Sequence, residues 1–305
     1  MTIRTVFMGS PEFSLPSLRR LAETYPVVGV VTQPDREAGR GRKLTPPPVK
    51  ILAQELGIPL IQPEKLRTPE AMAQLQEWAP DLIVVTAFGQ ILRPAVLDLP
   101  RCGCINVHGS LLPRGRGAAP IQDAILNGDA QTGVTIMKMD PGVDTGPMLA
   151  QSVMPILPDD NAQSLAQRMA ELGARLLVET LPPYIAGDLQ PQPQPETGAT
   201  YAPMLKKEDG RLDFTLTAEV LARRVRAFNP WPGAVMLWQD QILKVLQAHS
   251  LPGVGPQTVG KLIQHQGLPA VVCSAGILVL DEVQPAGKKP MPGKVFLNGS
   301  RGWGE

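Results

Sequence analysis

Residues 104–120 read Cys-Ile-Asn-Val-His-Gly-Ser-Leu-Leu-Pro-Arg-Gly-Arg-Gly-Ala-Ala-Pro. Ile105 and Val107 alternate with Asn106 and His108, which is the two-residue period of a β-strand with both polar side chains on one face. Gly109 ends this pattern, and a loop rich in glycine and proline follows it. An amide donor and an imidazole at the end of an apolar strand are suited to a reaction centre, although a solvated strand end has the same pattern.

Outward from this stretch, apolar runs alternate with segments of helical spacing. Strands are predicted at 3–8, 27–31, 58–61, 81–86, 102–108, 134–139 and 148–156, and helices at 14–23, 49–56, 68–78, 119–126 and 161–185. This alternation predicts an α/β fold, a doubly wound Rossmann-like parallel sheet, in which ligands bind beyond the carboxyl ends of the strands. Asn106, His108, residues 88–92 and residues 140–146 all follow predicted strands, so we expect them to meet. No G-x-G-x-x-G motif is present, which argues against a nicotinamide cofactor.

Residues 190–305 differ from the preceding residues in composition and in the spacing of their apolar runs. Residues 190–200 are rich in proline and glutamine and predict an extended linker. Beyond it, short β-prone runs at 234–238, 242–248, 270–273, 276–280 and 294–298 predict a smaller OB-like β-barrel. We therefore expect a catalytic domain at 1–189, a linker at 190–210 and a C-terminal domain at 211–305, since 305 residues are many for one domain.

The composition is that of an ordinary folded protein, with 43% hydrophobic and 19% charged residues and a net charge of +1. The sequence starts directly with a predicted strand and no apolar run approaches the roughly 20 residues of a spanning helix, so we expect a cytoplasmic protein, by default a monomer. The three cysteines fit a reducing compartment. A metal site made of Cys102, Cys104 and His108 is not expected, because a strand would place the first and last of them roughly 20 Å apart.

A basic segment precedes the predicted helix at 49–56. Residues 36–43 contain four cations, Arg36, Arg40, Arg42 and Lys43, against one acid. Glycines within the segment and Pro46–Pro48 after it predict a mobile loop, which is either an arm for phosphate groups or simply a solvated surface. Residues 201–305 carry 12 lysines and arginines against 8 acids, a mild excess that permits an anionic partner without requiring one.

The candidate catalytic residues fit acyl transfer without a covalent intermediate. Asn106 offers a donor to the oxygen of a carbonyl, His108 a second donor that exchanges protons near neutral pH, and Asp144 a carboxylate to orient the imidazole. Asn106 as a strand-end cap and Asp144 as a turn residue bonded to its own backbone are the structural alternatives. No serine nucleophile motif is present, so an amine attacking an acyl donor directly is the simplest chemistry.

The run Asn106-x-His108-Gly-Ser-Leu-Leu-Pro113, followed by Asp140-x-Gly-x-Asp144-Thr-Gly146, resembles the folate-dependent formyltransferases. The resemblance extends over nearly the whole chain, including the basic loop and the Lys206-Lys207-Glu-Asp-Gly210 junction. It implies a formyl donor, 10-formyltetrahydrofolate, as co-substrate and the α-amine of methionyl initiator tRNA as acceptor.

The same resemblance implies roles for individual residues. Asn106, His108 and Asp144 would be catalytic, Ser110, Leu111, Leu112 and Pro113 would bind the folate, and 88–92 with 140–142 would line its pterin pocket. The tRNA contacts would be Arg36, Arg40, Arg42, Lys43, Lys206 and Lys207, with Arg42 foremost and no metal involved. Gly115 departs from the pattern, because many relatives have an aromatic residue there, and it predicts a more flexible loop.

Two other functions remain open at this point. A sugar-nucleotide formyltransferase would share the catalytic motif, but a small substrate does not need an arginine-rich arm. A nucleic-acid-binding protein on a decayed enzyme scaffold would not need an intact set of Asn106, His108 and Asp144, and its C-terminal part would be expected to be more basic.

Overall fold

The computed structural model describes residues 2–38, 41, 43–253 and 258–304. The chain divides into two compact units. The first contains residues 1–120, 131–155 and 166–202, and the second contains 121–130, 156–165 and 203–305. Within the described residues, no helix is both long and apolar enough to cross a membrane.

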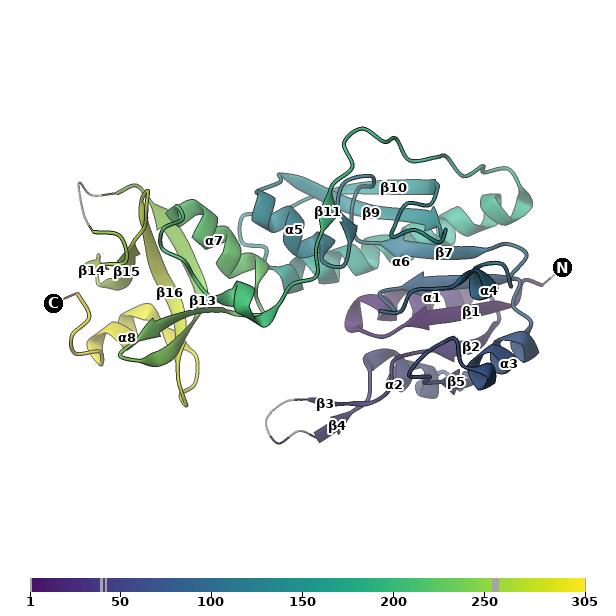
Figure 1. The fold of residues 1–305 in the computed structure, drawn as a ribbon, viewed down its shortest axis with the longest axis horizontal. Helices are drawn as coiled ribbons and strands as arrows, with labels where there is room; N and C mark the ends of the chain where they lie inside the picture. The colour runs from purple at the N-terminus through teal and green to yellow at the C-terminus, as the bar shows by residue number, and fades with distance from the viewer. Residues whose placement is uncertain (1, 39–40, 42, 254–257, 305) are drawn as a thin grey trace. The chain divides into compact units, whose positions relative to one another are not determined.

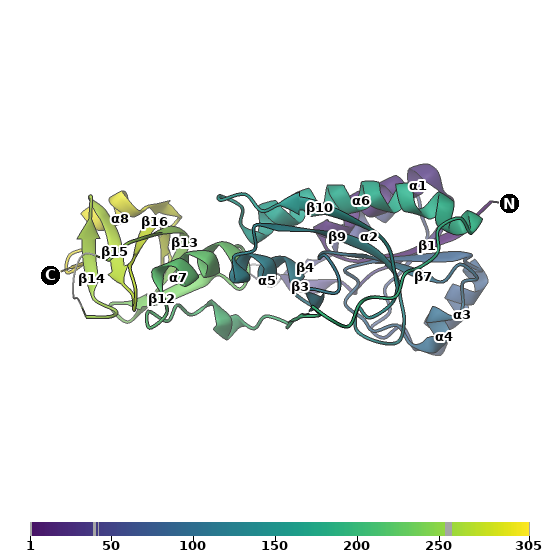
Figure 2. The same cartoon turned by 90° about the horizontal axis from the view of Figure 1, so that it is seen from above.

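The first unit is built on a seven-stranded sheet with the order β10-β9-β7-β6-β1-β2-β5 (Figure 1). Five neighbouring strands are parallel, as predicted: β5 (Leu60–Ile61), β2 (Val27–Val31), β1 (Thr5–Gly9), β6 (Leu82–Thr86) and β7 (Cys104–His108). Helices cover both faces, with α1 (Leu15–Thr24) and α6 (Ala162–Ala186) on one side and α3 (Pro69–Trp78) and α4 (Pro94–Leu97) on the other (Figure 2). A 3-10 turn at Glu12–Ser14 precedes α1, and α2 (Pro48–Glu55) precedes β5.

The expectation of an all-parallel sheet is wrong at one edge. β9 (Gln131–Lys138) runs antiparallel to β7, and β10 (Met148–Pro155) runs antiparallel to β9. Only residues 139–147 join β9 to β10, which is too short for a parallel crossover of a dozen or more residues. The sheet is therefore mixed, and the end of β9 lies beside the start of β7, where Lys138 is the partner of Ile105.

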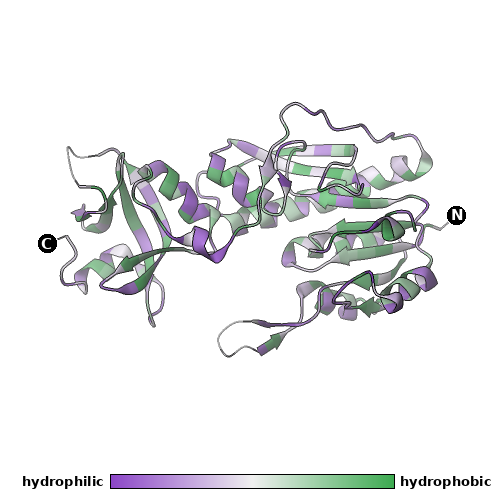
Figure 3. Cartoon of the chain, in the orientation of Figure 1, coloured by the Kyte–Doolittle hydropathy of each residue, from purple (hydrophilic) through white to green (hydrophobic). Residues whose placement is uncertain are grey.

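Burial of the strands holds this sheet together. The five residues of β1, β6 and β7 are buried throughout, and these strands are largely hydrophobic in Figure 3. The Trp78 ring packs directly against the backbone of Gly29, where an added Cβ would lie only 2.4 Å from that ring. Thr68 caps α3 as predicted, since its hydroxyl accepts from the Ala71 N–H, and Pro69 is the first helical residue.

The segment that predicted a mobile basic loop is partly a β-ribbon. β3 (Arg36–Ala38) pairs antiparallel with β4 (Lys43–Thr45). Arg40 and Arg42 lie outside the described residues. Extended β pairing therefore replaces the expected irregular loop on both sides of the turn.

The expected linker, residues 190–210, pairs with strands of the first unit at two places. Gln192 forms a bridge with Met148, and β11 (Tyr201–Ala202) pairs in parallel with β8 (Arg116–Gly117). The chain leaves the first unit only after Ala202.

The second unit contains an antiparallel sheet with the order β12-β13-β16-β15-β14, and β17 pairs with β16. Its strands are β12 (Ala234–Trp238), β13 (Gln241–Leu251), β14 (Leu262–His265), β15 (Leu268–Val272), β16 (Ile277–Pro285) and β17 (Met291–Pro292). Its helices are α5 (Pro120–Asn127), α7 (Ala218–Ala227) and α8 (Gly293–Asn298), with a 3-10 turn at Lys207–Gly210. The antiparallel sheet was predicted, whereas its closure into an OB-like barrel stays a prediction.

The strand predicted at 294–298 is wrong, because these residues form α8. Phe296 of this helix is buried and meets the rings of Trp238 and Trp303 at centroid distances of 5.1 and 5.4 Å. This aromatic cluster accommodates the helix despite the β-prone sequence, since packing overrides local preference.

Candidate active site

β7 presents its two polar side chains on one face of the sheet. Asn106 and His108 share that face with Cys104, while Val107 points to the opposite face, where a Cβ on Gly173 of α6 would touch it. Asn106 and His108 are both buried, with 8% and 6% of their surface exposed. The strand period predicted from the sequence is therefore the one observed.

The His108 ring lies between two oxygen atoms. Its Nε2 is 2.9 Å from the carbonyl oxygen of Gly115, and its Nδ1 is 3.6 Å from Oδ1 of Asp144. A carbonyl oxygen can only accept, so Nε2 carries the proton in this hydrogen bond and Nδ1 faces the carboxylate.

Asp144 reaches this ring by an unexpected path. Because β9 runs antiparallel to β7, residues 139–147 start beside the first residues of β7 and return over the face that carries Asn106 and His108. Asp144 has a φ of +53°, a left-handed conformation that a residue with a Cβ seldom adopts. Asp144 therefore meets Asn106 and His108 as predicted, but through a strained loop, whereas the contact of residues 88–92 with this cluster stays a prediction.

The carboxylate of Asp144 has three neighbours. Its Oδ2 accepts from the Gly117 N–H at 2.9 Å, and its Oδ1 lies 3.5 Å from Nδ2 of Asn106 and 3.6 Å from His108. One Asn106 N–H is thus turned toward Asp144. The second N–H of this amide makes no hydrogen bond to the part of the chain that the structure describes.

Gly115 is firmly held, contrary to the predicted flexibility. Its φ is +69°, its N–H donates to the hydroxyl of Thr200 at 2.8 Å, and its carbonyl accepts from His108. A Cβ at this position would lie 3.0 Å from the Cβ of Ser110. Both the backbone conformation and the close approach suit glycine.

The Ser110–Pro113 motif is fixed to β9 and β10. The buried hydroxyl of Thr135 donates to the carbonyl of Ser110 and accepts from the N–H of Leu112, and the amide of Gln151 bonds both Thr135 and the carbonyl of Leu112. The Ser110 hydroxyl donates to the carbonyl of Arg114 at 2.6 Å. The motif is thus a rigid loop beside His108, while its contact with a folate stays a prediction.

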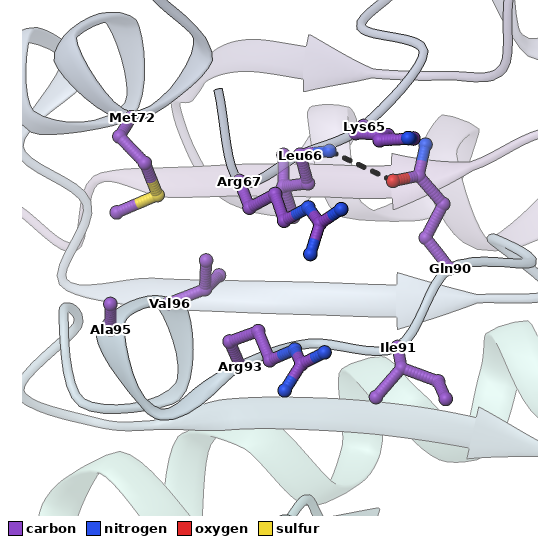
Figure 4. A pocket seen from close by; sticks show the side chains of 9 residues that line it. All are labelled: Lys65, Leu66, Arg67, Met72, Gln90, Ile91, Arg93, Ala95 and Val96. Atoms are coloured by element: carbon purple, nitrogen blue, oxygen red, sulfur yellow. Dashed lines mark hydrogen bonds between the residues drawn. The ribbon is translucent and has the colours of Figure 1, made fainter. Parts of the chain in front are cut away.

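A cavity of about 410 Å³ opens beside the segment that follows β6 (Figure 4). It combines an apolar wall with three cations and no acid; its lining residues are Lys65, Leu66, Arg67, Met72, Gln90, Ile91, Arg93, Ala95 and Val96. Gln90 fixes one side, since its Oε1 accepts from the Leu66 N–H at 2.9 Å. The size suits a small ligand, and the charge suits an anionic one.

The predicted tRNA-binding residues that the structure describes lie at the surface. The side chain of Arg36 on β3 forms an exposed ion pair with Glu64 at 3.7 Å, and Lys43 is exposed on β4. Lys206 and Lys207, also exposed, stand at the 3-10 turn of the second unit. An exposed pair of this kind contributes little to stability, so Arg36 can exchange Glu64 for a phosphate at small cost.

Cys104 shares a face of β7 with Asn106 and His108 but is a buried thiol. Burial raises the pKa of the Cys104 thiol to about 12, and its sulfur faces the carbonyls of Val96 and Leu97. Cys104 is therefore a core residue, as its position on β7 indicates. Across the described ranges, no group of three His, Cys, Asp or Glu side chains is placed to hold a metal ion.

Sequence reasoning missed several groups that hold this site. Thr135, Gln151 and Thr200 give no local signal, because they lie 16 to 85 residues from their partners. Arg93 directly follows the predicted pterin segment 88–92 and could have been noted as a cation beside it, whereas Arg67 lies far from that segment in the sequence.

A Rossmann-like sheet with Asn106, His108 and Asp144 gathered at one strand end is compatible with an enzyme of the formyl-transferring class. The chain belongs to the formyl transferase family: the formyl transferase model matches residues 7–181, and the model of the formyl transferase C-terminal domain matches residues 204–301.

Relatives of this family are similar over almost their full length. A methionyl-tRNA formyltransferase from Myxococcus xanthus is 51% identical, over 98% of this chain and 95% of the relative. One from Citrifermentans bemidjiense is 49% identical, over 97% and 93%. Among solved structures, an N-formyltransferase from Helicobacter canadensis in complex with folinic acid and dTDP-3-aminofucose matches with a TM-score of 0.66. It is 16% identical, over 93% of this chain and 100% of that one, and so supports the fold alone.

Proposed function

We propose that this chain transfers the formyl group of 10-formyltetrahydrofolate to the α-amino group of methionyl initiator tRNA, for translation initiation. The main support is that Asn106, His108 and Asp144 form one cluster. The chain that contains this cluster is about half identical, over nearly its whole length, to proteins named methionyl-tRNA formyltransferase. Both substrates follow from those names and from the family.

The reaction is a direct acyl transfer. The amine nitrogen attacks the formyl carbon, and the carbonyl oxygen gains negative charge in the tetrahedral intermediate. The free N–H of Asn106 donates to that oxygen. His108 moves a proton from the attacking amine toward the departing folate nitrogen, while Asp144, 3.6 Å from its ring, stabilises the ring whenever it carries the extra proton. The C–N bond to the folate then breaks, and the product is a formamide.

The folate is proposed to lie along the segment after β6. Its pterin would lie near residues 88–92 and 140–142, with Ser110–Pro113 as its binding motif. The cavity beside Gln90 contains Lys65, Arg67 and Arg93, three cations that suit the carboxylates of the glutamate tail. Its apolar wall suits the flat ring that precedes that tail.

The tRNA is proposed to contact both units. Arg36 and Lys43 on the ribbon, with Arg40 and Arg42 outside the described residues, would meet phosphates, and so would Lys206 and Lys207. An OB-like C-terminal domain would add to that surface. The expected domain limits of 1–189, 190–210 and 211–305, and a cytoplasmic monomer, stay part of this proposal.

An amino-sugar nucleotide is the second candidate acceptor. This candidate is considered because a structurally similar N-formyltransferase was crystallised with such a compound, dTDP-3-aminofucose. The basic ribbon and the much higher identity to tRNA enzymes favour tRNA. A decayed enzyme that only binds nucleic acid is disfavoured, because all three catalytic candidates are present and Asn106 and His108 both lie within 3.6 Å of the Asp144 carboxylate.

A side-by-side assay tests the proposal. Purified chain is incubated with 10-formyltetrahydrofolate and either methionyl initiator tRNA or an amino-sugar nucleotide, and formylated product is measured. Transfer to the tRNA with at least about 100-fold loss in His108→Ala is expected. Turnover of only the sugar nucleotide, or an unchanged rate in a folded His108→Ala variant, would overturn it.

A further inference from the structure

The segment Gln192–Ala202, which we call the strap, runs along the loops that hold the candidate catalytic residues. Most of its side chains are exposed, but Gln194 is half-buried. Gln194 uses every hydrogen-bonding group of its side-chain amide. Its Oε1 accepts from Nε and Nη2 of Arg116 at 3.0 and 2.8 Å, and its Nε2 donates to the carbonyls of Asp144 and Gly146, both at 2.8 Å.

The bond to Asp144 falls on the strained residue itself. A φ of +53° costs free energy for a residue with a Cβ and persists only where neighbouring contacts enforce it. Gln194 binds the carbonyl of Asp144 and that of Gly146 two residues later, so it holds the turn from its outer side. On the inner side, the carboxylate of Asp144 accepts from the Gly117 N–H.

The strap also binds the loop that faces His108. Thr200 accepts from the Gly115 N–H at 2.8 Å, and its carbonyl accepts from the Arg116 N–H at 3.0 Å. Gly115 in turn offers its carbonyl to His108, and Gly117 offers its N–H to Asp144. Each loop that touches a candidate catalytic side chain is thus bonded to the strap.

We infer that Gln194 is a positioning residue for formyl transfer, which acts through Asp144 and, with Thr200, fixes the loops around His108. This inference rests on the proposed function. Only a neutral amide satisfies both sides of the contact. A carboxylate would face two carbonyl oxygens, and a cation would face the guanidinium of Arg116.

The main experiment compares Gln194→Ala with Gln190→Ala. Gln190 is an exposed glutamine just before the strap, and its side chain donates to the carbonyl of Gly187. Gln194→Ala is expected to lower kcat by about 10-fold or more, because small displacements of reacting groups carry large rate losses. Its KM for both substrates should stay within about two-fold, since Gln194 holds the reacting groups rather than either substrate. Gln190→Ala should match the parent chain.

A second readout does not depend on turnover. The chain has three histidines, so the ring signals of His108 can be assigned in an NMR spectrum by comparison with His108→Gln. These signals should move in Gln194→Ala and stay in place in Gln190→Ala. A parent chain without transferase activity refutes the proposed function, whereas an active parent with equal kcat and equal His108 signals in both variants refutes the role of Gln194.

Two further variants separate the contacts. Gln194→Glu can still pair with Arg116 but loses both N–H donors, so it should behave like Gln194→Ala; parental kcat would overturn the assignment to the carbonyl contacts. If Gln194→Ala fails to fold, Thr200→Val takes its place, because it removes the acceptor of Gly115 and retains the shape. Parental kcat in folded Thr200→Val overturns the role of the strap.

Discussion

Thr135→Val removes one hydroxyl and should destabilise the first unit markedly. Thr135 is fully buried on β9. Its hydroxyl donates to the carbonyl of Ser110 at 2.7 Å and accepts from the N–H of Leu112 at 3.1 Å. Valine has nearly the same shape, so the loss is that of hydrogen bonds rather than of packing. Each buried polar group without its partner costs about 1–3 kcal/mol. Gln151 keeps its second acceptor, the carbonyl of Leu112, and adds little to the loss.

The loss of partners for two backbone groups should therefore destabilise the fold by about 2–6 kcal/mol in total. For a unit of this size, 1 kcal/mol corresponds to about 2–4 °C in Tm, so the Tm should fall by about 4–24 °C. Differential scanning calorimetry on the full chain measures this change in the transition of the first unit. The matched control is Thr132→Val, because Thr132 is also buried on β9 and its hydroxyl has no hydrogen-bond partner among the described residues. A Tm change below about 2 °C in Thr135→Val, or equal changes in both variants, would refute the reasoning.

Two further predictions concern titratable groups. At pH 8 a thiol reagent should modify Cys102 alone in the native chain and all three cysteines after denaturation. The reason is that burial raises the pKa of Cys104 to about 12 and that of Cys273 to about 11. Fast labelling of three thiols in the native chain would contradict this prediction. The backbone N–H of Arg4 holds the pKa of Asp81 below its ordinary value of 3.8, so the ionised carboxylate stabilises the fold above that pH and this contribution is lost as the pH falls through the lowered pKa. Asp81→Asn should therefore lower the Tm most at neutral pH, and the loss should shrink as the pH falls below 3.8; a loss independent of pH would show that the charge is not responsible.

The sequence predicted the fold where local pattern decides it. The buried strands at 5–9, 27–31, 82–86 and 104–108 and the capped helix at 69–78 follow from apolar runs, helical spacing and the Thr68-Pro69 pair. The antiparallel direction of β9 and the helix at 293–298 were not predictable in this way. Strand direction depends on which neighbours the chain meets, and α8 depends on an aromatic cluster whose members, Trp238 and Trp303, are far apart in sequence.

The candidate site shows the same division. Asn106 and His108 could be paired from the strand period alone, and Asp144 from its place after a strand. The glutamine and threonine that hold them could not, because Gln194 and Thr200 look like ordinary residues of a proline-rich linker. Their contacts with Asp144 and Gly115 span 50 and 85 residues.

The late position of the strap also sets the order in which the site is completed during synthesis. Thr200 follows Gly115 by 85 residues, which takes roughly 4–17 s at translation rates of about 5–20 residues per second. In the later part of that interval, once Asp144 has been added, a nascent chain contains Asn106, His108 and Asp144 before Gln194 and Thr200 can fix their loops. The ribosome thus finishes the geometry of the site seconds after it has added the last of the three side chains.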